Sequence, residues 1–557
     1  MIEKVFKELD ASQRMAVFSG SAAVLVVAPP GSGKTRVLAS RFARLVSEGA
    51  GPGSVLAVTF TVRAANEMRL RVKEITGKDL AGLDIGTFHG ICLEFLKKTR
   101  PGFILYGRDE VRGCLKALGV KKVEKAAERI SFVKNFYYGS PETLTSEERV
   151  FFEEYEARLR QENALDLDDL ILETVRALEE GGGGFEAGDF RQNFSHVLID
   201  EYQDINPPQA RLVKLLFQGG ASVFAIGDPD QAIYSFRGAS LESFMNFEKD
   251  FPGATIIRLK KNYRSAETVV RASASVISNN LKRPGCEASA VKKGGEVFTV
   301  RCPDERAMTG YIIQEIEKKM GGLTSLTATG EGGDSRFSDF AVLFRTNRQG
   351  EVILDAFKRS AIPSHLVGPP GAGFRDLLTR LKESTPVGDV LLVDLITEEA
   401  KAIKAAPEAL ELFLTTAERF SKVRAQECLD AFLEVTALLE PPDNLDINAD
   451  RVNLMTLHMA KGLEFKNVFI AGVEDGLIPL KRDGVDIEEE RRLFYVGMTR
   501  AVQDLYLLFA EKRRAWSEVL ESRPSPFIKE IPPGLVKEVN IKKRQFKRRP
   551  RQKGLFE

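Results

Sequence analysis

The sequence predicts an α/β fold built on two parallel sheets. Between Ala22 and Ile277, short and nearly continuous apolar runs alternate with amphipathic helical stretches, and a second alternation begins near Glu296. Such unbroken runs are typical of strands buried on both faces of a parallel sheet, and the helices between them provide the crossover connections. The expected strands are Val24–Val27, Val55–Phe60, His196–Ile199, Ser222–Ile226 and Thr255–Leu259, followed by Val297–Arg301, Phe340–Phe344, Val452–Thr456, Val468–Val473 and Asp504–Phe509.

Each alternation is interrupted by a long helical stretch, which we interpret as an insertion into an α/β domain. The first domain is expected to comprise residues 1–87 and 192–280, with a helical insertion at 88–191. The second is expected to comprise 281–373 and 451–525, with a smaller helical insertion at 374–450. The last segment, 526–557, turns basic. Ile541–Lys553 carries eight Lys or Arg residues and no acid, a composition typical of a disordered tail.

Composition excludes several classes of protein. The 80 Lys and Arg residues balance 79 Asp and Glu residues, which argues against a protein that coats nucleic acid by bulk charge. No apolar run approaches the roughly 20 residues of a membrane helix. The charged start has no signal-peptide core, so a cytoplasmic location is expected. The five cysteines and four histidines are scattered, which argues against a zinc site or an iron–sulfur cluster.

A glycine-rich turn directly follows the first expected strand and precedes a helical stretch. In this context backbone N–H groups surround a phosphate at the start of a helix. By this pattern, Lys34 would reach the β- and γ-phosphates of a nucleotide, and the Thr35 hydroxyl would bind Mg²⁺. The first position carries Ala28 where the general pattern has glycine. The turn is Ala28-Pro29-Pro30-Gly31-Ser32-Gly33-Lys34-Thr35.

Two acidic residues stand at the end of the expected strand His196–Ile199. A phosphate-loop enzyme needs a carboxylate for its metal ion and a group that positions the attacking water. Asp200 is the candidate for the metal ion, directly or through water, and Glu201 is the candidate base. Acids at strand ends are common, so the argument depends on their pairing with the phosphate loop. His196, at the start of the strand, is interpreted as structural.

Further motifs resemble those of superfamily 1 helicases of the UvrD/Rep/PcrA group and occur in the order found in that family. They span Leu9 to Phe509, nearly the whole chain. The resemblance implies two RecA-like motor domains with ATP bound between them. The motifs are Asp200-Glu201-Tyr202-Gln203-Asp204, Gly227-Asp228-Pro229-Asp230-Gln231-Ala232-Ile233-Tyr234, Asn262-Tyr263-Arg264-Ser265, Thr456-Leu457-His458-Met459-Ala460-Lys461-Gly462-Leu463-Glu464-Phe465, Glu489-Glu490-Arg491-Arg492 and Thr499-Arg500-Ala501.

The resemblance also implies roles at the nucleotide. Gln13 would recognise the adenine edge, and Tyr263 would stack on the adenine. Gln231 would sense the γ-phosphate. Arg264 and Arg500 would reach that phosphate as arginine fingers, which can contribute ~10³–10⁵ in rate. The alternative for any one arginine is a surface ion pair. The remaining implied contacts are Arg36 and, toward the ribose, Glu464.

The same family binds single strands, which requires stacking platforms and backbone contacts. Phe60 matches the family's stacking aromatic. Tyr234 and Phe236 match a second cluster, in which relatives often have Trp in place of Phe236. A role in the core is the alternative for these aromatics. The residues in motifs that touch the phosphate backbone or relay between sites are Thr87, His89, Arg345, Asn347 and His458.

The chain also departs from the family pattern. Val62-Arg63 stands where relatives usually carry Asn-Lys. Only about 75 residues separate Phe374 from Asp450, and they lack the family's duplex-contacting glycine-rich motif. We therefore regard the second insertion as reduced, which weakens the expectation that this chain separates strands by the family's usual route.

A short C-terminal peptide, Gln552-Lys553-Gly554-Leu555-Phe556, resembles the Gln-x-x-Leu-Phe peptides that dock into DNA sliding clamps. An apolar pair on a flexible basic tether suits such docking. The alternatives for the basic run before it are a solvated end and non-specific contact with phosphates, which salt would weaken.

These observations lead to a functional expectation. We expect an ATP- and Mg²⁺-dependent 3′–5′ DNA helicase or translocase that acts on single-stranded DNA and on single-strand/duplex junctions. It would serve replication, repair or recombination and associate with the nucleoid. The alternative is an ATP-driven translocase or switch that displaces or recruits proteins without unwinding duplex.

Overall fold

The computed structural model divides into two compact units. The first comprises Met1–Arg264, Asn280–Lys292 and Val367–Asp446, and the second comprises Ser265–Asn279, Lys293–Leu366 and Ile447–Glu557. The structure describes residues 2–77, 83–180, 190, 192–281, 283, 286–321, 335–368, 372–386, 388–405, 407–417, 420, 423–439, 449–482, 484–515 and 518–542.

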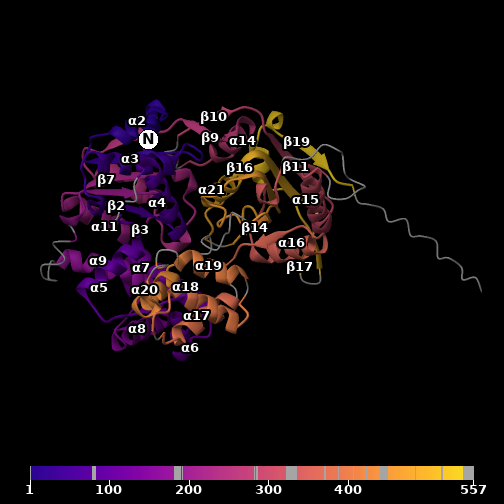
Figure 1. Cartoon of the computed structure of the whole chain (residues 1–557). Helices are drawn as coiled ribbons and strands as arrows, with labels where there is room; N and C mark the ends of the chain where they lie inside the picture. The colour runs from indigo at the N-terminus through magenta and orange to yellow at the C-terminus, as the bar shows by residue number, and fades with distance from the viewer. Residues whose placement is uncertain are drawn as a thin grey trace, which may run out of the picture. The chain divides into compact units, whose positions relative to one another are not determined.

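The first unit contains a six-stranded parallel sheet in the order β3-β2-β6-β7-β1-β8 (Figure 1). Its strands are β1 (Ala23–Val27), β2 (Val55–Thr59), β3 (Ile85–Thr87), β6 (His196–Ile199), β7 (Ser222–Gly227) and β8 (Thr255–Arg258). Its larger helices are α2 (Ala11–Phe18), α3 (Lys34–Ser47), α4 (Val62–Thr76), α5 (Phe88–Thr99), α6 (Arg108–Ala117), α7 (Val123–Tyr137), α8 (Ser146–Gln161), α9 (Leu167–Glu180) and α11 (Pro207–Gln218).

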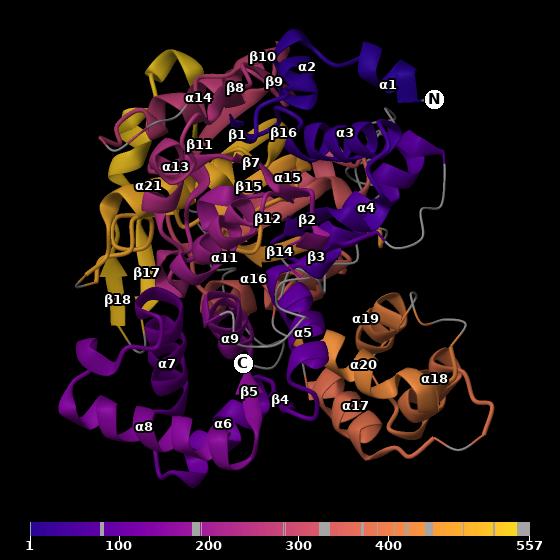
Figure 2. The same ribbon diagram turned by 90° about the vertical axis from the view of Figure 1, so that its left-hand side faces the viewer.

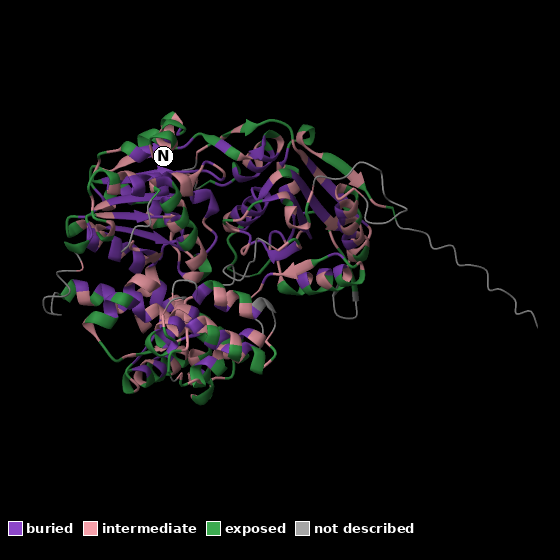
Figure 3. Cartoon of the chain, in the orientation of Figure 1, coloured by how far each residue is buried: buried purple, intermediate pink, exposed green. Residues whose placement is uncertain are grey.

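Helices cover both faces of this sheet. Successive side chains of a strand point to opposite faces, and both sets are apolar here. Val24 and Val26 join a core with residues of α2, α3 and α4. Leu25 and Val27 join a second core with residues of α5, α9 and α11. Figure 2 shows the two groups of helices, and Figure 3 shows the buried strands between them.

All five strands expected in this sheet are present, with ends that differ by at most one residue. The structure adds β3, which pairs in parallel with β2. Its three residues, Ile-Gly-Thr, are too few to show a periodic pattern, so the sequence did not predict it. The smaller elements of the unit are α1 (Ile2–Lys7), η1 (Pro52–Ser54), η2 (Pro141–Thr143), η3 (Tyr202–Asp204), η4 (Pro229–Gln231), η5 (Ser235–Arg237), α12 (Leu241–Met245), α13 (Phe247–Asp250) and β10 (Ser289–Lys292); β10 pairs with β9 (Lys261–Ala266).

The first insertion is mainly helical, as expected, but also contains a short parallel pair. β4 (Ile104–Tyr106) pairs with β5 (Ala164–Asp166), which the sequence did not predict. Beside this pair, the Lys134 ammonium is buried at 2.7 Å from a carboxylate oxygen of Asp166, of Asp169 and of Glu156. Removing one partner from a buried ion cluster costs about 3–5 kcal/mol. The cluster therefore fixes how α7 packs on α9.

The second insertion forms four helices around an apolar core of its own. These helices group with the first unit and carry ion pairs to the first insertion, between Lys382 and Glu110 and between Lys97 and Glu434. The domain boundaries expected from sequence remain predictions. The helices are α17 (Ala372–Glu383), α18 (Leu392–Ala402), α19 (Pro407–Ala417) and α20 (Ala425–Ala437).

The second unit is built on a seven-stranded parallel sheet in the order β13-β14-β12-β15-β16-β11-β19. The five strands expected here are present. The strands are β11 (Glu296–Cys302), β12 (Phe340–Phe344), β13 (Ser364–Leu366), β14 (Val452–Thr456), β15 (Phe465–Ala471), β16 (Ala501–Ala510) and β19 (Lys537–Asn540). The other elements are α14 (Glu267–Ile277), α15 (Glu305–Lys319), η6 (Phe337–Asp339), α16 (Asn347–Arg359), α21 (Ile487–Met498), η9 (Pro526–Glu530), η10 (Pro533–Leu535) and the hairpin β17 (Lys512–Ala515)–β18 (Glu518–Glu521).

Part of the segment expected to form the tail belongs to this sheet. β19 pairs in parallel with Phe298–Arg301 of β11, and two short helices, η9 and η10, precede it. The polar composition of β19 concealed it, because its place depends on backbone hydrogen bonds along an edge strand. The basic run Ile541–Lys553, apart from its first two residues, and the peptide Gln552–Phe556 lie outside the described residues. Among the described helices, none is long and apolar enough to cross a membrane.

Candidate functional site

The glycine-rich turn lies where β1 ends and α3 begins. Gly31 and Gly33 have φ angles of 70° and 85°, in the left-handed region that favours glycine. A Cβ on Gly31 would also lie 2.6 Å from the Arg264 Cβ and 2.7 Å from the Asn262 Oδ1. Gly33 immediately precedes α3 and has no side chain to cap it. The first N–H groups of α3 can therefore bind an anion.

The motif that contains Tyr263 forms hydrogen bonds with this turn. Asn262 is 4% exposed, and its side-chain amide donates to the Pro30 carbonyl at 2.9 Å. The Tyr263 N–H donates to the Gly31 carbonyl at 2.8 Å. The Tyr263 hydroxyl donates to Asp10 at 2.6 Å, while its ring stays 37% exposed. The turn is thus held from outside by a motif more than 200 residues away, and a ring remains free for stacking.

Gln13 is held against the same turn. Asp10 caps α2 and forms a reciprocal capping box with Gln13. The Gln13 amide then donates to the Ser32 carbonyl at 2.9 Å. Burial raises the pKa of Asp10, but hydrogen bonds from Tyr263, Gln13 and Ser12 outweigh it and hold that pKa below its usual value. Arg36, expected at the nucleotide, pairs with Glu8 at 2.8 Å and is partly exposed.

Buried carboxyl groups gather beside Lys34 at the carboxyl ends of β6 and β7. Burial, together with Glu201, raises the pKa of Asp200 to about 7. Burial, together with Asp230, raises the pKa of Asp228 to about 6. The Lys34 ammonium opposes both shifts and donates to the Ala28 carbonyl at 3.2 Å. The site therefore holds more buried negative charge than its own lysine neutralises.

A hydrogen-bonded relay joins two of the motifs. The Gln203 amide donates to Glu201 at 2.6 Å, and its oxygen accepts from the Asp228 N–H at 2.9 Å. The Gln231 amide then donates to the Asp228 carboxylate at 2.7 Å. Glu201 has φ 49°, a left-handed conformation that is strained for a residue other than glycine. Sequence reasoning assigned no role to Gln203, although it lies within a recognised motif.

The residues present fit a magnesium ion of the phosphate-loop type. Such a site uses one or two carboxylates together with the phosphates of the nucleotide. Desolvation raises the pKa of Asp200, so a cation beside it would favour its ionised form, and Thr35 lies in the first turn of α3. Among the described residues, no three or more His, Cys, Asp or Glu side chains form a metal cage. A site completed by nucleotide phosphates needs no such cage.

The expected strand-binding residues of the first unit line one pocket of about 540 Å³. The rings of Phe60 and Tyr234 are stacked, with centroids 5.1 Å apart and an interplanar angle of 10°. Phe236 packs edge-on against Tyr234 and is 57% exposed. Arg237 lies over both rings, 5.3 Å from Tyr234 and 5.9 Å from Phe236. Phe236 and the partly exposed Phe60 are therefore accessible for stacking, with a cation beside them, whereas Tyr234 is buried and supports the Phe60 ring.

Polar groups complete this pocket. Thr87 and His89 line it, and Thr87 caps α5 by accepting from the Gly90 N–H at 3.1 Å. Asp168 accepts from Asn135 at 2.7 Å, and burial, together with Asp166, raises the pKa of Asp168 to about 6. No local pattern predicts the side of the pocket formed by Asn135 and Asp168, because the first insertion supplies it through packing. The pocket is also lined by Arg108, Arg112, Asp204 and Leu438, the last of which follows α20.

The other expected site residues belong to the second unit. Arg345 pairs with Glu490 at 2.8 Å. Arg500 is 1% exposed and donates to the carbonyls of Val496 at 2.9 Å and Leu463 at 3.1 Å. Asn347 and Glu464 are exposed, and His458 is half-buried. The roles expected for these five residues remain predictions.

Comparisons with known proteins match nearly the whole chain. Residues 9–252 match the UvrD/REP helicase N-terminal domain, and residues 257–374 and 383–512 match the UvrD-like helicase C-terminal domain. ATP-dependent DNA helicase UvrD1 of Mycobacterium leprae is 30% identical over 96% of this chain and 87% of its own length. ATP-dependent DNA helicase PcrA of Bacillus subtilis has the same values, and DNA helicase II of Escherichia coli is 29% identical over 97% and 90%.

The alignments also locate a difference in size. The match to UvrD1 runs over 688 aligned positions, more than the 557 residues of this chain. That relative therefore contains segments that this chain lacks. The C-terminal match is interrupted between residues 374 and 383, where the second helical insertion begins. Neither value places the extra segments of the relative, so the reduced second insertion remains a prediction.

Gly31→Ala should weaken nucleotide binding. The left-handed backbone alone costs a residue with a Cβ about 1–2 kcal/mol, and the new methyl group would also displace Asn262 and Arg264. We expect the Kd for ATP to rise roughly tenfold or more by isothermal titration calorimetry. Gly113→Ala is the matched control, because a Cβ there meets nothing within 4 Å. An unchanged Kd in Gly31→Ala would contradict this view of the turn.

Proposed function

Because the chain belongs to the UvrD/REP helicase family, we propose that it is an ATP-dependent DNA helicase of the UvrD/PcrA type that moves 3′ to 5′ on single-stranded DNA. One observation carries the proposal. The two chain segments that form the Glu201–Gln203–Asp228–Gln231 relay continue directly into the strand pocket. The first segment reaches it at Asp204, and the second reaches it at Tyr234 and Phe236.

The nucleotide side of this mechanism follows from the buried charges. Lys34 and the N–H groups at the start of α3 bind the phosphates, with Tyr263 available to stack on the base and Gln13 to contact its edge. Thr35 and Asp200 would hold Mg²⁺, which would supply charge neutralisation at the phosphates. Glu201 holds the attacking water and takes its proton. Arg264 and Arg500 are proposed to stabilise the charge on the γ-phosphate.

Movement along the strand then follows from the relay. Gln231 bonds to Asp228 before the reaction, so a γ-phosphate near either group competes for that hydrogen bond. Loss of the phosphate restores it and shifts the segment that continues to Tyr234. The stacked pair Phe60–Tyr234 then changes its hold on a base. Stacking has no sequence preference, as a motor on DNA requires, because every base has a π-face.

A second candidate function is supported by the reduced second insertion. Two of its helices, α17 and α20, form ion pairs with the first insertion, and Leu438 lines the strand pocket. It is therefore placed to shape strand binding, while the relatives' longer chains contain segments missing here. On this view the chain moves on single strands and displaces or recruits proteins without unwinding duplex, in replication, repair or recombination at the nucleoid.

Lys34→Ala should abolish ATP hydrolysis and leave strand binding largely intact. Lys34 is the cation that acts on both Asp200 and Asp228, whereas the strand pocket is lined by other residues. We expect turnover to fall at least ~10²-fold in a phosphate-release assay. Fluorescence anisotropy with a labelled oligonucleotide should give a Kd near that of the wild type. Lys249→Ala, on the exposed side of α13, is the control. Full ATPase activity in Lys34→Ala would refute the assignment.

Phe60→Ala should weaken single-strand binding. The change removes one ring of the stacked pair, and base–aromatic stacking is worth about 1–3 kcal/mol. The Kd for an unstructured oligonucleotide should therefore rise roughly 5- to 150-fold. Phe60→Trp keeps a π-face and should restore most of the affinity, whereas Phe6→Ala, in α1, should have no effect. Equal binding by Phe60→Ala and wild type would place the ring in the core instead.

We further propose that the C-terminal peptide Gln552–Phe556 binds a DNA sliding clamp. Its Gln-x-x-Leu-Phe pattern on a basic tether supports this idea. Deleting Gln552–Glu557 should abolish clamp binding in surface plasmon resonance, and a chain with these six residues in scrambled order should behave like the deletion. Undiminished binding by either variant would sink the clamp proposal while leaving the motor proposal untouched.

A further inference from the structure

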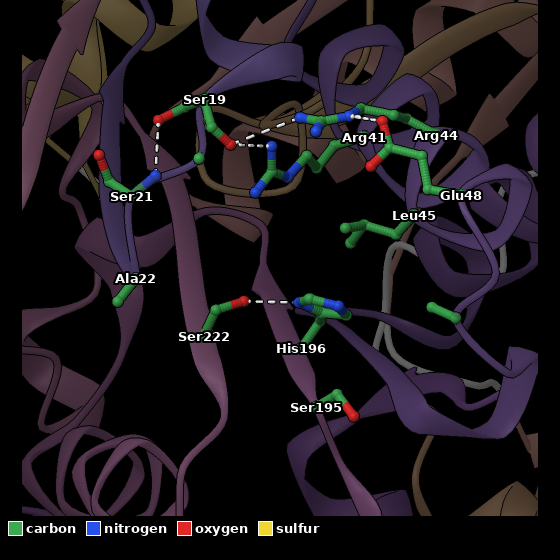
Figure 4. Close-up of a pocket in the computed structure, with 12 residues that line it drawn as sticks. Ser19, Ser21, Ala22, Arg41, Arg44, Leu45, Glu48, Ser195, His196 and Ser222 are labelled. Carbon is green, nitrogen blue, oxygen red and sulfur yellow. Dashed lines mark hydrogen bonds and ion pairs between the residues drawn. The ribbon is translucent and has the colours of Figure 1, made fainter.

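A second pocket lies in the first unit, at the end of the sheet's strands opposite the phosphate loop. Its volume is about 450 Å³, and it opens where β1, β6 and β7 begin. None of its residues takes part in the nucleotide or strand sites described above. It is lined by Ser19, Gly20, Ser21, Ala22, Arg41, Arg44, Leu45, Glu48, Ala50, Ser195, His196 and Ser222 (Figure 4).

Arg41 places a buried positive charge in this pocket. The residue is 5% exposed, and its Nη1 donates to the carbonyls of Val17 at 2.8 Å and Ser19 at 2.5 Å. Its Nε is buried and has no hydrogen-bond partner among the described residues. No carboxylate in the described ranges forms an ion pair with it. Burial, together with Arg44, lowers the pKa of Arg41 to about 10, so it is still charged at neutral pH.

Arg44 forms an ion pair with Glu48, the one acid that lines the pocket. Its Nε pairs with Glu48 at 2.7 Å, and its Nη1 donates to the Val17 carbonyl at 3.0 Å. Aromatic rings hold both guanidinium groups from behind, Phe224 at 5.5 Å from Arg41 and Phe18 at 5.1 Å from Arg44. Both cations are therefore fixed in place, and the pocket keeps a net positive charge.

Hydrogen-bonding groups stand on the opposite side. Figure 4 shows His196 and Ser222 across the pocket from Arg41 and Arg44, and the His196 Nδ1 lies 2.7 Å from the Ser222 hydroxyl oxygen. Burial, followed by Arg41 and Arg44, lowers the pKa of His196, and Glu48 opposes this effect. His196 is thus uncharged at neutral pH, but a nearby anion would favour its protonation.

The contacts of the arginines with α2 do not explain the whole arrangement. The carbonyls of Val17 and Ser19 stand at the C-terminal end of α2, where arginines commonly bond to unpaired carbonyl groups. One arginine would suffice for that purpose. Three features are left unexplained: the second arginine, the buried Arg41 Nε without a partner, and the lack of a carboxylate paired with Arg41 among the described residues. Leaving a buried N–H of a charged group without a partner is unfavourable, and an anionic ligand beside the guanidinium would offset this cost.

We propose that this pocket binds a phosphate monoester dianion, either free orthophosphate or the phosphate of a small phosphorylated compound. Guanidinium groups match phosphate oxygens in geometry and charge, and neighbouring hydroxyl and imidazole groups complete such sites. The volume lies within the roughly 300–1,000 Å³ of small-molecule pockets and exceeds what one phosphate fills. His196, interpreted as structural from sequence, becomes a ligand-contacting residue.

Histidine NMR tests this site directly, because the chain has only four histidines. Chain with ¹³C-labelled histidine, saturated with ADP and Mg²⁺ to fill the phosphate loop, is titrated with orthophosphate and, separately, with ribose 5-phosphate. Sodium chloride of equal ionic strength is the control. His196→Gln identifies the signal of His196. We expect that signal to move saturably and the pKa of His196 to rise as ligand binds.

Two variants decide the outcome. Arg41→Gln removes the buried charge, and Ser222→Asp places a carboxylate across the pocket without touching the arginines. Each should weaken binding roughly tenfold or more, since charge-assisted hydrogen bonds to phosphate are lost or opposed. Tighter binding of the sugar phosphate would identify a phosphorylated compound as the ligand, and equal binding would identify the free ion. A His196 signal that does not move, or moves equally in Ser222→Asp, would overturn the proposal.

Discussion

The first unit depends on buried negative charge at the carboxyl edge of its sheet. Asp200 follows β6 and Asp228 follows β7, and burial raises the pKa of both. Ionised carboxylates are costly in such a place unless cations and hydrogen bonds compensate them. Lys34 supplies part of the compensation, and Gln203 and Gln231 supply hydrogen bonds. The metal ion of a bound nucleotide would compensate the rest of this negative charge.

In the proposed function, this constraint also links the two sites of the unit. The groups that compensate Asp228 lie on segments that continue to Asp204 and Tyr234 in the strand pocket. A change of charge at the nucleotide therefore alters hydrogen bonds on those segments first. The opposite end of the same strands shows the reverse situation, because Arg41 forms no ion pair among the described residues and the one nearby acid, Glu48, is paired with Arg44. The two ends of the strands in this sheet therefore favour ligands of opposite charge, a cation at the carboxyl end and an anion at the amino end.

Much of the fold was predictable because its signals are local. Ten expected strands are present, since continuous apolar runs mark strands buried on both faces. β3 was too short to show a pattern, and β19 is polar and depends on backbone bonds to β11. At the site, the glycines and Lys34 were predictable from the sequence because the phosphate-loop pattern has a fixed spacing. The Gln203 relay and the side of the strand pocket formed by Asn135 and Asp168 were not, because they arise from tertiary packing. The pairing of Arg345 with Glu490 likewise has no local signal.

The central claim is that ATP hydrolysis drives directed movement on a single strand. Stopped-flow fluorescence on oligonucleotides labelled at the 5′ or the 3′ end measures this movement, alongside unwinding of duplexes with a 3′ or a 5′ single-stranded tail. We expect ATP-dependent arrival at the 5′ end, with a delay that grows with strand length, and any unwinding only from the 3′ tail. Arrival at the 3′ end, or a signal that is independent of ATP and of strand length, would contradict it.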